Sequence, residues 1–284
     1  MTTSPLRLSL TDISNMQDMT SEVCATAAVG DSVQLKDTRD GKYYWTSKLA
    51  DGKCWMTQNL DLDLSTRRTL TPNDSDVHSS WTPNYATATT ASSSTILADD
   101  TGQRSWDLGN YRIATPTTSS DCGSGKSDAA DCPSQFTPYP TPTSANGDIN
   151  AHYILGNHYQ WNSATAGTGI ATVSDRATSS ICPKGWKLPT SNAGGEYGIM
   201  AQAVGIYSSK QAVGAPFYGV VGGTIGQETY YLFQHAGNIG FYWSSTPVSD
   251  DRSSYGLYIP FTAIFNTSGT SSRSTGASVR CIAR

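Results

Sequence analysis

The sequence predicts a loop-rich α+β fold, and three observations predict it. Strand signals stand near both ends of the chain, in the aromatic run Tyr43–Leu49 and in the β-branched run Val279–Ile282. An amphipathic helix is predicted over Glu196–Tyr207. Much of the remaining chain is rich in Ser, Thr, Gly and Asn, which is typical of loops and short strands.

Composition and charge limit the class of protein. Hydrophobic residues make up 37% and charged residues 15% of the 284 residues, which fits an exported protein better than a helical cytosolic enzyme. The formal net charge is −4 and no basic run occurs, so we expect no nucleic-acid partner. The sequence contains no long apolar run and no basic amphipathic stretch, so we expect no direct membrane insertion.

Six widely spaced cysteines form neither a CxxC pair nor a zinc-type cluster with histidine. An even number of this kind predicts disulfides in an oxidising compartment, and six reduced, buried thiols are the alternative. Fifteen connectivities are possible. Cys122 and Cys132 stand ten residues apart in a polar segment and are interpreted as a local staple. Because disulfides are predicted, we expect an extracellular or cell-surface protein. No signal peptide is visible, so its export signal and any anchor are expected to be absent from this sequence.

The N-terminal part is expected to form an extension, 1–36, with a short helix near Met16–Cys24. The first strand, Tyr43–Leu49, is followed by Asp51-Gly52. This pair predicts a hairpin turn, because Gly accepts a positive φ and Asp tolerates one. Cys54–Leu60 then returns as a second strand or extended segment.

The main domain is expected over 37–284, interrupted by a long insertion at 65–150. The insertion is rich in Thr, Ser, Pro and Asp and buries little per residue, so we expect loops and short strands there. After it, a helical pattern predicts a helix within Tyr153–Ala164. In the helix predicted over Glu196–Tyr207, the apolar face holds Tyr197, Met200, Ala201 and Val204.

Six short sequences follow one another in an order seen in a known family. They are RDGKYY (39–44), CWMTQNL (54–60), GNHYQWNSA (156–164), CPKGWKLPT (182–190), YWSST (242–246) and GASVRC (276–281). In this order they resemble the Fibrobacter succinogenes major paralogous (FISUMP) domain, over about 37–64 and 151–284. The resemblance implies a C-type lectin-like fold, in which the two chain ends meet in one sheet.

The resemblance also implies that Cys182 pairs with Cys281, and that Tyr43–Leu49 lies near Ser278–Ile282. It places Trp186 and Trp243 in the core. A β-branched last strand needs a partner and the N-terminal hairpin has a free edge, which agrees with this arrangement. The favoured disulfides are Cys24–Cys54, Cys122–Cys132 and Cys182–Cys281. The family does not explain the extension or the insertion.

No cofactor or metal is expected. His152 and His158 are six residues apart, which is not the spacing of a helical metal pair. Asp61 and Asp63 alternate as in a strand and have the oxygen ligands that Ca²⁺ prefers, although a solvated strand face is the simpler interpretation. The calcium-dependent sugar motifs of true C-type lectins are absent.

The protein is not expected to be an enzyme. The sequence contains no hydrolase, phosphate-loop or dinucleotide motif. The formylglycine-generating enzymes share the lectin-like fold but need a reactive pair of cysteines, and here Cys182 and Cys281 are better explained as a structural bridge. A relative of those enzymes is the remaining catalytic alternative.

The end of the chain has an unusual composition. Lys, Glu, Gln, Met and Trp make up 33 of the 284 residues, yet the last 49 residues contain only Trp243, where about seven of these residues would be expected. None of the five can be encoded when both adenines of an AAC or AAT codon are randomised. The pattern resembles the hypervariable C-termini of diversity-generating retroelement targets, which sit on C-type lectin-like folds. A Ser/Thr/Gly-rich display strand that lacks long side chains is the alternative.

A ligand-binding surface is therefore predicted on the C-terminal stretch. Leu257 and Ile259 are expected to point to the core, while Tyr258 and Pro260 point outward. Aromatic anchors, one arginine and small polar residues are typical of protein-binding surfaces. The predicted site residues are Asp250, Asp251, Arg252, Ser253, Tyr258, Pro260, Phe261, Phe265, Asn266, Ser272 and Thr275. Phe261 and Phe265 are alternatively core side chains.

The expected function is an exported ligand-binding module whose partner is a protein or glycan at a cell surface. A structural cell-surface protein without diversification is the alternative.

Overall fold

The computed structural model describes residues 8–62, 110–111, 156, 158–166, 176–225, 233–234, 239–249, 253–260, 265–273 and 275–284. Short helices and antiparallel strand pairs make it a mixed α+β structure, as predicted. The helices are η1 (Leu10–Asp12), η2 (Met16–Asp18), α1 (Ser21–Thr26), α3 (Trp161–Ala164), α4 (Glu196–Val204) and α5 (Ser209–Ala212). The strands are β1 (Ser32–Lys36), β2 (Tyr43–Lys48), β3 (Cys54–Met56), β4 (Asn110–Tyr111), β5 (His158–Tyr159), β6 (Trp186–Lys187), β7 (Thr224–Ile225), β8 (Phe233–Gln234), β9 (Ile239–Pro247), β10 (Ser253–Pro260), β11 (Asn266–Ser272) and β12 (Ile282–Ala283).

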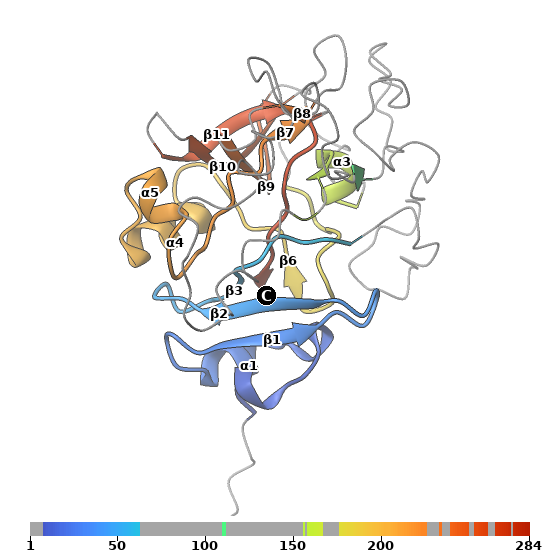
Figure 1. Cartoon of the computed structure of the whole chain (residues 1–284), viewed down its shortest axis with the longest axis vertical. Helices are drawn as coiled ribbons and strands as arrows, with labels where there is room; N and C mark the ends of the chain where they lie inside the picture. Colours follow the sequence, from blue (N-terminus) through green and yellow to red (C-terminus); the bar gives the residue numbers. More distant parts are fainter. Residues whose placement is uncertain are drawn as a thin grey trace, which may run out of the picture.

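The largest sheet joins the two ends of the described chain, in the order β1-β2-β3-β12-β6. β2 and β3 form the predicted hairpin, in which the Leu49 N–H donates to the Lys53 carbonyl at 2.9 Å and Gly52 has a φ of +79°. The last strand, β12, adds to the hairpin through β3, where Ile282 pairs with Trp55. In Figure 1 this sheet lies at one end of the molecule, with β9, β10 and β11 toward the other.

Residues 8–36 contribute directly to this sheet and to its core. β1 pairs antiparallel with β2, and the side chains of Met16 and Met19 are buried. The Trp186 indole N–H donates to the Met16 carbonyl oxygen at 2.8 Å. The short helix expected near Met16–Cys24 is present as η2 and α1. The described part of the expected extension is therefore integral to the domain.

Two of the three predicted disulfides are confirmed. Cys24 bonds to Cys54 and Cys182 to Cys281, each with a Cα–Cα distance of 5.8 Å. The first ties α1 to β3, and the second ties the segment before β6 to the residue before β12. Cys122 and Cys132 lie outside the described residues.

Buried tryptophans organise the core, as predicted for Trp186 and Trp243. Among the described residues four indoles are fully buried, and each N–H donates to a nearby oxygen at 2.7–2.8 Å. A buried indole needs such an acceptor, because an unsatisfied N–H would cost about 1–3 kcal/mol. The four pairs are Trp55 with the Asp51 carboxylate, Trp161 with the Ser244 carbonyl, Trp186 with the Met16 carbonyl and Trp243 with the Tyr159 carbonyl.

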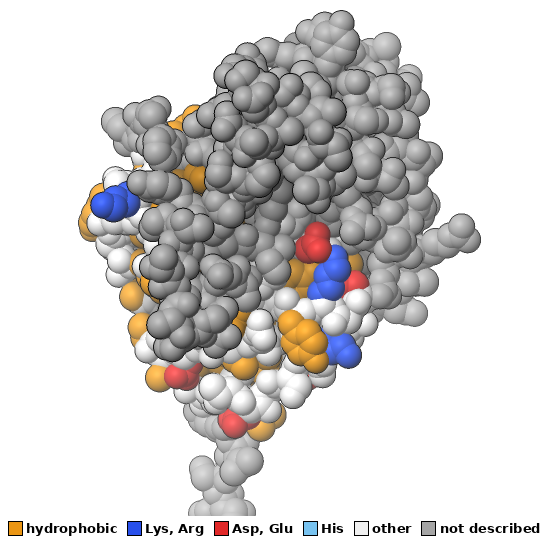
Figure 2. All heavy atoms as spheres, viewed as in Figure 1, with side chains coloured by type: hydrophobic (Ala, Val, Ile, Leu, Met, Phe, Trp, Pro, Cys, Tyr) orange, Lys and Arg blue, Asp and Glu red, His pale blue; other side chains and the backbone are white. Residues whose placement is uncertain are grey.

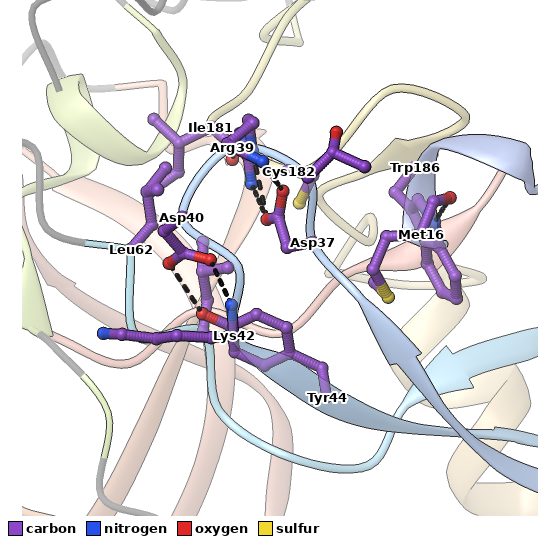
Figure 3. Close-up of polar contacts among 12 residues, drawn as sticks. Met16, Asp37, Arg39, Asp40, Lys42, Tyr44, Leu62, Ile181, Cys182 and Trp186 are labelled. Atoms are coloured by element: carbon purple, nitrogen blue, oxygen red, sulfur yellow. Dashed lines mark hydrogen bonds and ion pairs between the residues drawn. The ribbon is translucent and has the colours of Figure 1, made fainter. Parts of the chain in front are cut away.

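A buried ion pair fixes the turn between β1 and β2, as Figure 3 shows. Arg39 Nε lies 3.0 Å from Asp37 Oδ1, and its Nη2 lies 2.7 Å from Asp37 Oδ2. Arg39 Nη1 also donates to the Ile181 carbonyl at 2.7 Å, next to the second disulfide. Burial acts to raise the pKa of Asp37, but the charge and hydrogen bonds of Arg39 hold that pKa below its usual value.

The two helix predictions have different outcomes. α4 confirms the predicted helix, with Tyr197, Met200 and Ala201 buried, and it ends at Gly205, whose φ of +79° suits a glycine C-cap. The helix expected within Tyr153–Ala164 is wrong for the first half of its described part. His158 and Tyr159 form strand β5, and only the last four residues, Trp161–Ala164, are helical.

Candidate functional site

β10 is the central strand of a three-stranded sheet of order β11-β10-β9. As predicted, Leu257 and Ile259 point into the core and are fully buried. The expectation that Pro260 points outward is wrong, since it is buried and pairs with Ile239. Tyr258 is half-buried, with its ring 6.5 Å from that of Phe241.

The reason for this burial is that β10 runs between two core clusters. Leu257 and Ile259 belong to the cluster beside α4 and α5, whereas Tyr258 packs against the cluster built around the largest sheet. Alternate residues of the strand therefore both meet protein. The strand also needs glycine at Gly256, where a Cβ would lie 2.4 Å from the Tyr242 carbonyl oxygen.

The remaining predicted site residues divide by exposure. Asn266 and Ser272 are exposed on β11, and Ser253 and Phe265 are half-buried. Thr275 is buried, so its expected place on the surface patch is wrong. Asp250, Asp251, Arg252 and Phe261 lie outside the described residues.

The exposed end of β11 lies beside helix α4 and forms a groove with it. The groove has a volume of about 440 Å³ and is lined by Gly198, Ala201, Gln202, Ile206, Tyr207, Phe265, Asn266 and Thr267. Tyr207 is 71% exposed and Ile199, on α4, is 47% exposed. Of the predicted site residues, the groove brings together Phe265 and Asn266.

Sequence reasoning missed the contribution of α4 to the groove. Tyr207 was interpreted as the end of the helix, but the helix ends before Gly205 and Tyr207 follows in a loop. The sequence feature that points to Tyr207 is its position two residues after the helix-ending Gly205, with the buried Ile206 between them.

Side-chain hydrogen bonds tie β11 to the loop before α4 and tie α4 to β6. The Ser191 hydroxyl, in the loop before α4, donates to the Thr267 carbonyl at 2.5 Å. The Glu196 carboxylate accepts from the Thr190 N–H at 2.9 Å and pairs with Lys187 at 2.7 Å, which fixes the helix N-terminus on β6. The groove walls are therefore anchored in the scaffold.

The groove offers hydrogen bonding without charge. None of its lining residues is Asp, Glu, Lys, Arg or His. The Oδ1 of Asn266 accepts from the Ser268 N–H at 2.8 Å, which directs the amide N–H₂ of that side chain to other partners. The described part of the face in Figure 2 is mostly uncharged, with a few Lys, Arg, Asp and Glu side chains. The arrangement favours a neutral ligand.

A buried arginine joins the segment after β3 to the segment after α5, and its guanidinium also lies 5.2 Å from the ring centre of Tyr242 on β9. Arg280 is fully buried, and its Nε donates to the Asn59 Oδ1 at 2.8 Å. Its two Nη atoms donate to the carbonyls of Phe217 and Tyr218. The guanidinium also lies 4.6 Å from the centre of the Phe217 ring, within reach of a cation–π interaction.

His158 and Asp61, the described residues that were considered as metal ligands, have other partners. His158 is buried, with Nε2 3.1 Å from the Gly223 carbonyl, and burial lowers the pKa of its imidazole to about 4. Asp61 lies outside any strand and accepts from Lys42, while Asp63 is not among the described residues. Among the residues that the structure describes, no group of three or more His, Cys, Asp or Glu is placed to hold a metal ion.

Comparison of the chain with protein families, curated proteins and solved structures gives no match. Within the described ranges, no helix combines the length and apolar character needed to cross a membrane.

Proposed function

We propose that this protein is an exported ligand-binding module, with the groove between α4 and β11 as its binding site. The observation that carries the proposal is the groove itself, an uncharged recess of about 440 Å³ at an exposed strand end. Concave sites lined by aromatic and aliphatic side chains with a few polar groups are typical of ligand pockets. The ligand is a neutral part of a protein or glycan.

The scaffold that we propose is C-type lectin-like. Two features support it, namely the meeting of both chain ends in one sheet and the bond between Cys182 and Cys281. The two disulfides also support an oxidising compartment, hence an extracellular or cell-surface location.

The position of the groove also supports diversification of its ligand-binding wall. Phe265, Asn266 and Thr267 belong to the C-terminal segment that is depleted in Lys, Glu, Gln, Met and Trp. The other wall, on α4, lies outside that segment. A reverse transcriptase gene and an adenine-rich near-copy of the 3′ end beside this gene are expected; their absence would contradict diversification and leave the binding proposal standing.

The binding proposal is tested by screening the labelled protein against a glycan array and a phage-displayed peptide library. For any ligand found, Tyr207→Ala and Asn266→Ala are each expected to weaken binding at least about tenfold. The matched control is Tyr43→Ala, because Tyr43 is also largely exposed, at 55%, but lies on β2. Equal effects of Tyr207→Ala and Tyr43→Ala would place the binding site elsewhere.

A further inference from the structure

The first residues of β11 form a sequence triplet with a chemistry of its own. Asn266, Thr267 and Ser268 match Asn-x-Ser, the pattern in which an asparagine amide of an exported protein accepts an N-linked glycan. The middle residue is not proline, which the pattern excludes. The triplet alone is weak evidence in a chain this rich in Ser and Thr, so its geometry in the fold decides its meaning. A second triplet of this kind, at 73–75, lies outside the described residues.

A β-bulge sets the triplet apart from the regular pairing of β10 and β11. On one side of the bulge Tyr258 pairs with Asn266. On the other side Gly256 pairs with Gly269, so three steps along β11 match two steps along β10. The two residues between Asn266 and Gly269 therefore face a single residue of β10. A bulge of this kind bends the strand and changes the direction of its side chains, so the triplet has the backbone of a short turn on an outer strand.

The amide of Asn266 is engaged on one side only. Its Oδ1 accepts from the Ser268 N–H at 2.8 Å, which closes an Asx turn over the bulge. The amide is planar, so its nitrogen is directed away from that N–H. Within the described part of the chain Nδ2 donates to no protein group, and the side chain is exposed. A sugar attached to Nδ2 therefore displaces no contact of the described fold.

We propose that Asn266 is an acceptor site for an N-linked glycan. The co-reactant is a glycan whose first sugar is joined through its C1 to a lipid diphosphate. Nδ2 attacks this C1, so that an N–C bond forms and the C1–O bond to the diphosphate breaks. The lipid diphosphate leaves with the electron pair, and one amide proton passes to a base of the transferase. Ser268 supplies the hydroxyl that the pattern requires.

The exported setting of this reaction agrees with the two disulfides of the described chain. Asn266 also lines the groove between α4 and β11, so a glycan on its amide would stand at one groove wall. The acceptor site does not depend on the ligand proposed for the groove, because the triplet, the bulge and the free amide nitrogen are its whole basis.

The test is mass spectrometry of the protein isolated from the cells that produce it. Trypsin cleavage after Arg252 and Arg273 releases the peptide 253–273, in which Asn266 is the single asparagine. Most of this peptide is expected to carry the added mass of a glycan, and electron-transfer fragmentation is expected to place that mass on Asn266. An unmodified peptide, or a glycan on a serine or threonine instead, overturns the proposal.

Variants produced in the same cells decide whether the triplet directs the modification. Ser268→Ala removes the required hydroxyl and is expected to abolish the glycan, whereas Ser268→Thr keeps a hydroxyl and is expected to retain it. The matched control is Ser271→Ala, because Ser271 is also a half-buried serine of β11 but lies outside the triplet. This control is expected to keep the glycan. A glycan that persists in Ser268→Ala, or that is lost equally in Ser271→Ala, contradicts the assignment.

Discussion

The five-stranded and the three-stranded sheets are fixed by different means. The larger sheet is held covalently, since one disulfide includes Cys54 of β3 and the other lies beside β6 and β12. No described cysteine lies in the three-stranded sheet, and polar contacts to buried groups hold its edge strand β9. The Ser244 hydroxyl donates to the Tyr255 carbonyl at 2.6 Å, and the Tyr197 hydroxyl donates to the Trp243 carbonyl at 3.2 Å.

The inner strands of the larger sheet differ from the outer strand of the smaller one. β3 and β12 of the larger sheet are buried along their whole length, and its edge strand β1 buries Leu35 against the N-terminal helices. In the smaller sheet the outer strand β11 leaves Asn266, Thr270 and Ser272 exposed. This difference teaches that the inner strands of the larger sheet serve rigidity, whereas β11 is suited to display. Exposed side chains on β11 can change where those of β3 and β12 cannot.

The largest expected effect comes from opening the longer disulfide loop. Replacing Cys182 and Cys281 by Ser is expected to lower the free energy of unfolding by about 4 kcal/mol, because the bridge closes a long loop and constrains the unfolded chain. Urea denaturation measures it. Replacing Cys24 and Cys54 opens a loop whose ends are 30 instead of 99 residues apart. The free energy of unfolding should therefore fall by about 1 kcal/mol less than in the first variant. A greater loss from the shorter loop contradicts this ranking.

The next effect concerns the buried arginine. Arg280→Met removes the donors to Asn59, Phe217 and Tyr218 and should lower the free energy of unfolding by about 3 kcal/mol. The matched control is Arg284→Met, because Arg284 is exposed and lies four residues further along the chain. Similar chemical-denaturation midpoints for the two variants would show that the buried hydrogen bonds of Arg280 do not stabilise the fold.

Local patterns were enough to predict the elements that depend on neighbouring residues. The Asp51-Gly52 turn follows from backbone preferences, and α4 follows from the spacing of Tyr197, Met200 and Ala201. The pairing of Cys182 with Cys281 was implied by the family resemblance, not by the spacing of the cysteines.

Features that depend on distant packing were not predictable in this way. The alternation rule placed Pro260 outside because it assumes one solvated face, whereas β10 has core on both faces. The groove joins α4 to a strand more than sixty residues later, so no local pattern contains both walls. The acceptors of Arg280 at Phe217 and Tyr218 are equally remote in sequence.

A comparable effect is expected from pH. The pKa of His158 is lowered to about 4 by burial, so the unfolded chain takes up the proton first as pH falls. The contribution of His158 to the free energy of unfolding is complete above about pH 6.5. It should fall by about 1.4 kcal/mol per pH unit between pH 6.5 and 4. His158→Gln keeps a side-chain donor for the Gly223 carbonyl and removes the titration. Denaturation midpoints measured across this range should lose that slope in the variant; an unchanged slope assigns it to other groups.

The smallest effect is expected from substitutions on β11. Comparing them with substitutions at buried positions tests most directly whether the exposed strand positions are independent of the scaffold. The measurement is a saturation library at Asn266, Thr270 and Ser272, compared with one at Ser254, Gly256 and Leu257, scored by protease resistance on the cell surface. Most substitutions at the three exposed positions should change the free energy of unfolding by less than about 0.5 kcal/mol. Most at the three buried positions should cost more than about 1 kcal/mol. Equal tolerance at the two sets would contradict the account.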